Sequence, residues 1–180
     1  MMPRHFVFLR AINVGGHTTR METLRQEFES LGFSEVETFI ASGNVAFQSA
    51  ENDTAALEQK IAAGLQAALG YAVAAFIRSG LELNQIAAYP AFPLAQVQAA
   101  TAFNVAFLPG PLEEADVRKL MALKTGIDDF AYHGREVYWL CQKKQSESTF
   151  SNALLERTLG MKTTLRGLNT LRKMAEKYAA

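Results

Sequence analysis

The order of strand-like and helix-like runs along the chain is the feature that most constrains its fold. In the first half, the strand-like runs lie at 5–10, 36–40, 44–48 and 72–77. Apolar residues repeat at three- and four-residue steps after the first and third of these runs, which is typical of amphipathic helices. The first half therefore reads β-α-β-β-α-β.

Local signals mark the ends of these helices. Thr19 followed by Glu22 has the spacing of a capping box, so we expect the first helix to begin there. Asn52 or Asp53 is expected to cap the second helix, which Gly70 ends.

The same order recurs in the second half, with strand-like runs at 103–108, 127–132, 136–141 and 162–166. A C-terminal helix is expected from about Asn169. We therefore predict an α+β protein with two ferredoxin-like βαββαβ units, each with an antiparallel sheet covered on one face by two helices, together with a connecting helix. The predicted division is a unit at 1–78, a helical, proline-containing connector at 79–99, and a second unit with the C-terminal helix at 100–180.

The first strand is apolar at all four positions from Phe6 to Leu9. A strand with one face in water alternates apolar and polar residues, so this run predicts burial on both faces. The expected cover is the other unit or a second subunit. The alternative is that an aromatic side chain stays exposed.

Composition excludes several classes of protein. Lys plus Arg equals Asp plus Glu at 18 each, so the chain lacks the basic excess of a protein that coats nucleic acid. Cys141 is the single cysteine, which excludes an intramolecular disulfide and multi-thiolate metal sites. His5, His17 and His133 have no metal-ligand spacing, so we expect no metal or cofactor. With neither a leader nor a membrane span in evidence, a cytoplasmic location is expected.

The leading ligand hypothesis is an anion site in the loop that follows the first strand. Backbone N–H groups of a glycine loop before a helix can bind phosphate or carboxylate, with a nearby arginine as a charged donor. The residues are Arg10, Asn13, Gly15 and Gly16. They predict a small-anion-binding or partner-binding module, and the alternative is simple turn chemistry.

A second glycine turn, at Ser42-Gly43-Asn44, is expected to join two strands as a hairpin. We expect it to lie at the opposite end of the sheet from the Arg10–Gly16 loop, and therefore to be structural.

The other lead is the charge of residues 142–180, which carry eight basic and three acidic side chains. Nucleotide or RNA binding is thus an alternative, less favoured because no RNA-recognition motif is present. Tyr138 or Trp139 would be the stacking platform. The phosphate contacts would be Lys162, Arg166, Arg172 and Lys173.

An enzyme acting on a phosphorylated small molecule is a third and weaker alternative. Cys141 lies in an apolar run and is expected to pack in the core. The pairs Glu113-Glu114 and Asp128-Asp129 are adjacent in sequence and suit a helix start or a solvated turn. No catalytic group is predicted.

Several segments together resemble one family of uncharacterised bacterial proteins, domain of unknown function 1697. They are Leu9–Gly16, Leu31–Phe33, Ser42–Phe47, Gly134–Tyr138, Leu155–Gly160 and Thr164–Thr170. The resemblance implies two ferredoxin-like subdomains and no established activity. Two departures are Ala11, where the family usually has glycine, and Leu168, where it usually has tryptophan. The ligand, the oligomeric state and the biological process are not predicted.

Overall fold

Two compact units make up the chain. The structure is a computed structural model that describes residues 2–13, 16, 18–40 and 43–178. The first unit comprises Met1–Asn84 with Tyr178–Ala180, and the second comprises Gln85–Lys177.

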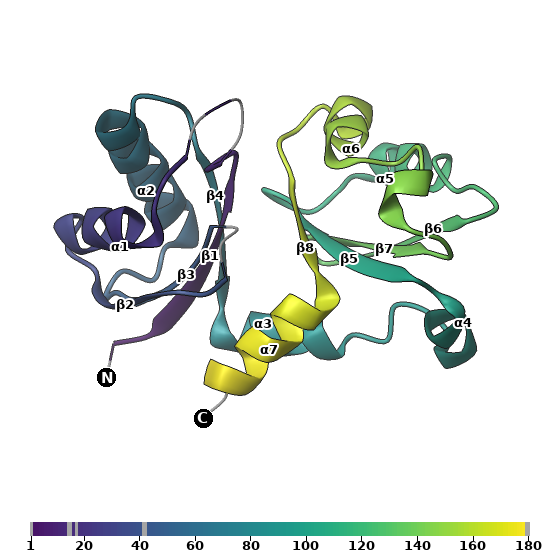
Figure 1. The fold of residues 1–180 in the computed structure, drawn as a ribbon, viewed down its shortest axis with the longest axis horizontal. Helices are drawn as coiled ribbons and strands as arrows, with labels where there is room; N and C mark the ends of the chain where they lie inside the picture. The colour runs from purple at the N-terminus through teal and green to yellow at the C-terminus, as the bar shows by residue number, and fades with distance from the viewer. Residues whose placement is uncertain (1, 14–15, 17, 41–42, 179–180) are drawn as a thin grey trace. The chain divides into compact units, whose positions relative to one another are not determined.

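The first unit has the predicted βαββαβ order (Figure 1). Its elements are β1 (Arg4–Arg10), α1 (Met21–Ser30), β2 (Ser34–Thr38), β3 (Asn44–Gln48), α2 (Thr54–Leu69) and β4 (Ala74–Ser79).

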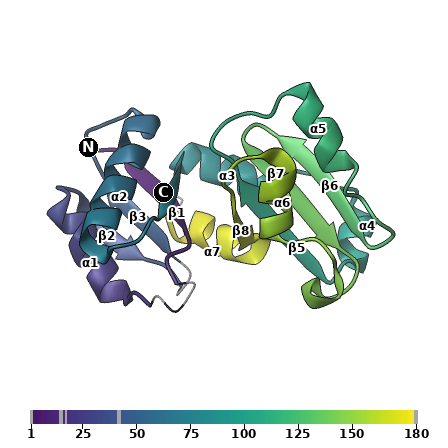
Figure 2. The ribbon, with the colours of Figure 1, turned by 90° about the horizontal axis from the view of Figure 1, so that it is seen from above.

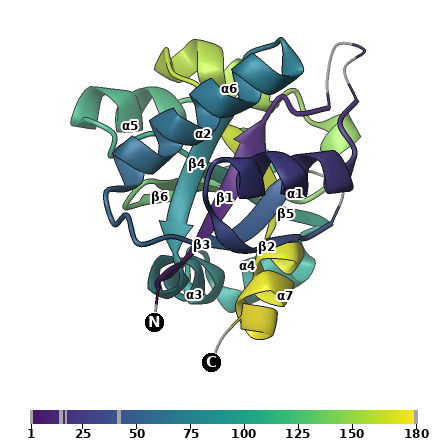
Figure 3. The same ribbon diagram turned by 90° about the vertical axis from the view of Figure 1, so that its left-hand side faces the viewer.

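The first sheet has the strand order β2-β3-β1-β4, and every neighbouring pair is antiparallel. Helices α1 and α2 cover one face, in front of the strands in Figure 3. Val7 of β1 and Ile61 of α2 are both fully buried in the core between sheet and helices. Burying a side chain of this size stabilises the fold by about 1.5–3 kcal/mol, so this face holds the unit together.

The other face of β1 is buried as well. Phe6 and Phe8 have exposed fractions of 1% and 0%, which confirms the predicted burial on both faces. Tyr178 supplies part of the cover, because its ring centroid lies 5.2 Å from that of Phe6. The hydroxyl of Tyr178 donates a hydrogen bond of 2.7 Å to Glu37 on β2.

The second unit repeats the order after two further helices (Figure 1). The elements from the unit boundary onward are α3 (Gly80–Ala88), α4 (Leu94–Ala99), β5 (Ala102–Phe107), α5 (Glu114–Met121), β6 (Asp128–His133), β7 (Glu136–Cys141), a 3-10 turn (Gln145–Glu147), α6 (Asn152–Leu159), β8 (Thr164–Gly167) and α7 (Leu168–Tyr178).

The second sheet has the equivalent strand order, β6-β7-β5-β8, and is also antiparallel throughout. Helices α5 and α6 lie on one side of it, toward the viewer in Figure 2. Leu155 of α6 packs with Trp139 and Cys141 in its core. The α+β class and the two ferredoxin-like units are thus confirmed.

The segment predicted as a connector contains α3 and α4, and the boundary between the units falls inside α3, after Asn84. Pro93 directly precedes α4 and occupies its N-cap position. Proline lacks an N–H and has a fixed φ, so it can stand before a helix as well as break one.

One helix start differs from the prediction. Helix α1 begins at Met21 with Arg20 as its N-cap, and no side chain caps it. The Thr19–Glu22 capping box is therefore wrong. By contrast, Asp53 caps α2 as predicted, accepting a hydrogen bond of 3.1 Å from the Ala56 N–H.

Within the described ranges, no helix combines the length and the apolar character that crossing a bilayer requires.

Candidate functional site

The loop after β1 and the β2–β3 hairpin meet at one end of the first sheet. The Leu9 N–H donates a hydrogen bond of 2.9 Å to the Gly43 carbonyl, and Asn44 pairs with Phe8. The prediction that these loops lie at opposite ends is wrong. Strands β1 and β2 are both antiparallel to β3, so they run parallel to each other and their carboxyl ends share one edge.

Side-chain hydrogen bonds hold the β1–α1 loop in place. The Asn13 Oδ1 accepts a bond of 2.8 Å from the Thr19 N–H. Tyr71, which follows α2, donates a bond of 2.6 Å to the Ile12 carbonyl, and its hydroxyl lies 2.8 Å from that of Thr19. The Thr19 hydroxyl thus serves the loop and not the helix start.

The hairpin requires glycine at position 43. Gly43 has a φ of +78°, and a Cβ there would lie 2.9 Å from Ile12 Cγ2 and 3.1 Å from Leu9 Cβ. The two loops approach each other so closely because this position carries no side chain.

Each of the two loops also contains a non-glycine residue in the left-handed region. Ala11 has a φ of 68° and Ile40 a φ of 60°. Such conformations cost about 1–3 kcal/mol each, and the cost is high for a β-branched residue such as Ile40. The surrounding contacts therefore hold both loops in conformations that the isolated residues disfavour.

A small hollow lies between the two loops and the start of α1. Its volume of about 10 Å³ leaves room for roughly one water molecule. Met21 and Ile40 line it with side chains that are 38% and 47% exposed. A larger ligand would have to bind at the rim and not inside.

The described residues of the predicted anion site lie at this end of the sheet. Asn13 and Gly16 are exposed, and Gly16 has a φ of +83° with no atom within 4 Å of where a Cβ would be. Gly15 lies outside the described residues, as does Ser42 of the hairpin. Arg10 is the half-buried last residue of β1. Side chains alternate along a strand, so Arg10 falls on the face of Phe8, whereas the hollow opens on the helix-covered face.

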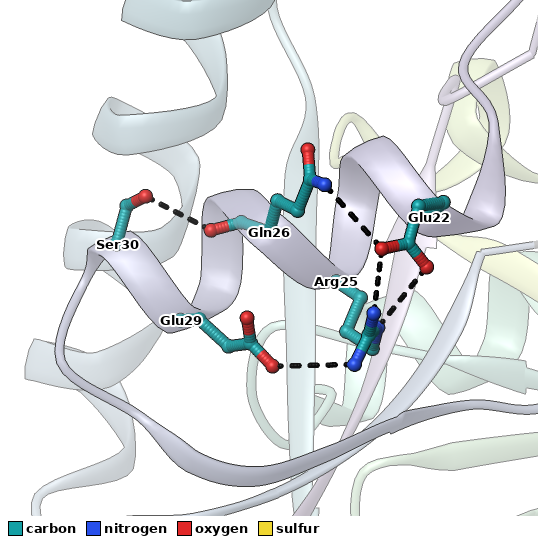
Figure 4. Close-up of polar contacts among 5 residues, drawn as sticks. All are labelled: Glu22, Arg25, Gln26, Glu29 and Ser30. Atoms are coloured by element: carbon teal, nitrogen blue, oxygen red, sulfur yellow. Dashed lines mark hydrogen bonds and ion pairs between the residues drawn. The ribbon is translucent and has the colours of Figure 1, made fainter.

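Arg25 pairs with two glutamates of its own helix, α1 (Figure 4). Arg25 lies 2.5 Å from Glu22 and 3.5 Å from Glu29. The hydrogen bond from Arg25 holds the pKa of Glu22 below its ordinary value. Arg25 is therefore engaged on its own helix.

The basic residues of the C-terminal region do not all lie on one solvated surface. Arg166 is only 7% exposed, and its guanidinium donates to the Thr164 hydroxyl and the Leu165 carbonyl. Burial lowers the pKa of Arg166 to about 10. Lys162 is exposed between α6 and β8, and Arg172 and Lys173 are exposed on α7.

The predicted stacking platform is wrong. Tyr138 and Trp139 are 1% and 2% exposed, so neither ring can stack on a base. Cys141 is buried as predicted, and burial raises the pKa of its thiol, which disfavours a thiolate nucleophile. In the part of the chain that the structure describes, no three His, Cys, Asp or Glu side chains group as metal ligands would.

Sequence reasoning missed a buried carboxylate in the second unit. Asp128 is 2% exposed, not solvated as predicted, and accepts hydrogen bonds from Trp139 Nε1 at 2.9 Å, the Ser148 hydroxyl at 2.8 Å and the Thr125 hydroxyl at 2.8 Å. Burial raises the pKa of Asp128, but these hydrogen bonds outweigh it and leave the pKa below its ordinary value. The available signal was Thr125, three residues earlier, whose hydroxyl also accepts from the Asp128 N–H.

Known proteins match the chain in two ways. A family model described as protein of unknown function (DUF1697) matches residues 2–138, so the resembling segments after residue 138 lie beyond the matched range. The structure of a conserved bacterial protein, SP0830 from Streptococcus pneumoniae, is similar with a TM-score of 0.79 and 22% identity over 100% of both chains, which shows the shared fold. No curated protein matches. The model covers well over half of the sequence and includes both loops of the candidate site, and the chain therefore belongs to the DUF1697 family of proteins of unknown function.

Proposed function

We propose that the first unit is a small-anion-binding module whose ligand binds at the end of the sheet where the β1–α1 loop and the β2–β3 hairpin meet. The observation that carries this proposal is the pair of left-handed non-glycine residues, Ala11 and Ile40, one in each loop. Backbone strain of this kind clusters at ligand sites, because a fixed loop binds without first having to be ordered.

The chemistry of the loop favours an anion. Arg10 ends β1 immediately before Ala11, and a guanidinium gives short charge-assisted hydrogen bonds to carboxylate or phosphate oxygens. Gly16 presents exposed backbone with open space around its Cα, so a ligand can approach it closely. The hollow between the loops holds about one water and opens on the face away from Arg10, so the ligand binds against the loop backbone beside Arg10 and not in the hollow.

Calorimetric titration tests this function. The full chain is titrated with inorganic phosphate, small carboxylates and mononucleotides, and the heat of binding is measured. We expect at least one of these anions to bind, and we expect Arg10→Ala to weaken that binding by about tenfold or more, since a charged hydrogen bond contributes about 1.5–3 kcal/mol.

Arg118→Ala is the matched control, because Arg118 is exposed on α5 of the second unit and forms an ion pair with the exposed Glu114. Its binding should equal that of the unaltered chain. Anion binding that Arg10→Ala leaves intact would contradict the proposal. An absence of binding would also contradict it, and would leave the exposed Met21 and Ile40 as contacts for a protein partner.

A further inference from the structure

The second unit contains a larger hollow, of about 190 Å³, far removed in sequence from the loops discussed above. Three segments line it: the end of α4, the beginning of β5 and the first turn of α7. In Figure 1, α4 and the start of α7 both lie on the side of the second sheet opposite to α5 and α6.

The strand register explains why the hollow exists. The β5–β8 ladder ends at the pair Asn104–Gly167, and α7 begins at the next residue, Leu168. Ala102 and Phe103 therefore extend beyond the last paired residue of β8, and the chain leaves the sheet as a helix where the ladder would otherwise continue. The hollow occupies this missing strand position.

The polar lining of the hollow is positive. Arg172 and Asn169 are three residues apart on α7, so their side chains lie on one face of the helix. Among the described residues Arg172 forms no ion pair, and the residues that line the hollow include no carboxylate. The positive end of the α7 dipole adds to the charge of Arg172.

Apolar side chains form part of the remaining lining. Val97, Phe103 and Leu168 contribute hydrocarbon surface beside the polar pair. The volume of about 190 Å³ is enough for a compact organic molecule. One fixed cation beside an apolar wall suits one carboxylate on a short apolar body.

We propose that this hollow, formed by Arg172 and Asn169 of α7 with Val97 and Phe103 as its apolar wall, is a binding site for a small monocarboxylate. The guanidinium of Arg172 accepts the carboxylate in its planar fork, and the Asn169 amide donates to the same group. This site is separate from the anion site proposed for the first unit and shares no residue with it.

Amide chemical shifts of the isotope-labelled full chain, titrated with benzoate, test the proposal. We expect benzoate to shift the amides of Thr101, Phe103 and Asn169, and the neutral benzamide, which has the same shape, to leave them in place. Arg172→Gln should weaken benzoate binding at least tenfold. Lys173→Gln, which removes an equal charge from the adjacent residue outside the hollow, should not change it.

A second variant separates binding from folding. Asn169→Asp places a carboxylate in the first turn of α7, where the helix dipole favours it, so the fold should be retained while benzoate is repelled. The proposal is overturned if benzoate shifts none of these amides, or if the shifts persist in Arg172→Gln. It is also overturned if inorganic phosphate produces the same shifts. Arg10→Ala should leave the benzoate shifts unchanged, so failure of either site is distinguishable from failure of the other.

Discussion

His5 of β1 is only 4% exposed and stacks on Phe47 with ring centroids 5.5 Å apart. Neither ring nitrogen has a hydrogen-bond partner among the described residues. Burial lowers the pKa of His5 below its ordinary value, and the Glu51 backbone and the Glu82 carboxylate offset only part of this effect. The folded protein therefore keeps this imidazole neutral at a pH where the unfolded chain would protonate it.

This difference makes the stability of the protein depend on pH in a defined direction. Below about pH 6.5 the unfolded chain binds a proton at His5 that the folded chain resists, so the free energy of unfolding falls as the pH falls. We expect His5→Phe, which keeps the stacked ring, to reduce the loss of stability between pH 7 and pH 5, as measured by thermal unfolding.

His133→Gln is the control for this experiment, because His133 is exposed at the end of β6. If His5→Phe and the unaltered chain lose stability in parallel between pH 7 and pH 5, the explanation from His5 is refuted.

At the scale of elements, Asp128 joins parts of the second unit that are distant in sequence. Its carboxylate, at the start of β6, accepts from Trp139 on β7 and from Ser148 after the 3-10 turn. Because both partners bond a buried anion, the contact fixes the β6–β7 hairpin against the segment that leads into α6.

Replacing the Asp128 carboxylate should lower the stability of the second unit. Asp128→Asn keeps the size of the side chain but turns one acceptor into a donor that faces a hydroxyl, so we expect a loss of about 2–3 kcal/mol in urea unfolding at pH 7. The difference between variant and parent should shrink below about pH 4, where protonation of Asp128 removes its contribution.

Glu114→Gln serves as the comparison, since Glu114 is 88% exposed and its ion pair with Arg118 should contribute well under about 1 kcal/mol. If Asp128→Asn and Glu114→Gln lower the free energy of unfolding by the same amount, burial of Asp128 adds nothing to the stability of the protein.

The elements differ in how far the sequence predicts them. Asp53 and Gly70 mark the ends of α2 correctly because capping and left-handed C-termini are local geometry. Helix α4 was missed because it has six residues and none is buried, so no apolar periodicity reveals it.

The candidate site was predicted less well for a related reason. The anion-loop residues were predicted from a glycine pair before a helix and a nearby arginine, but the partner loop at Gly43 was assigned to the wrong end of the sheet. Its position depends on β1 and β2 being parallel to each other across β3, a property of the whole sheet. Burial of Asp128 and Arg166 likewise depends on distant segments, so charge alone placed both in water.

At the scale of the whole molecule, the first unit is discontinuous in sequence, because Tyr178 belongs to it. Its ring packs on Phe6, its hydroxyl bonds Glu37, and the Arg4 guanidinium lies 5.0 Å from the ring centroid. One residue of the last helix thus combines an aromatic contact, a hydrogen bond and a cation–π contact.

Two substitutions should separate the contribution of the Tyr178 hydroxyl to stability from that of its ring. We expect Tyr178→Phe to lower the free energy of unfolding by about 1 kcal/mol, the typical net value of one hydrogen bond, because the bond to Glu37 is only partly buried. Tyr178→Ala also removes the ring and should cost about 2–3 kcal/mol.

Guanidinium unfolding, followed by circular dichroism, gives both values. Equal losses for the two variants would mean that the ring contributes nothing beyond its hydroxyl.

The place of Tyr178 in the chain also has a consequence during translation. The ribosome makes the strands of the first sheet early, but the whole second unit must be synthesised before Tyr178 emerges. Until then Phe6 lacks its aromatic neighbour, and a nascent chain carries apolar surface of the kind that chaperones bind. The first unit therefore cannot be completed until the second unit has been synthesised.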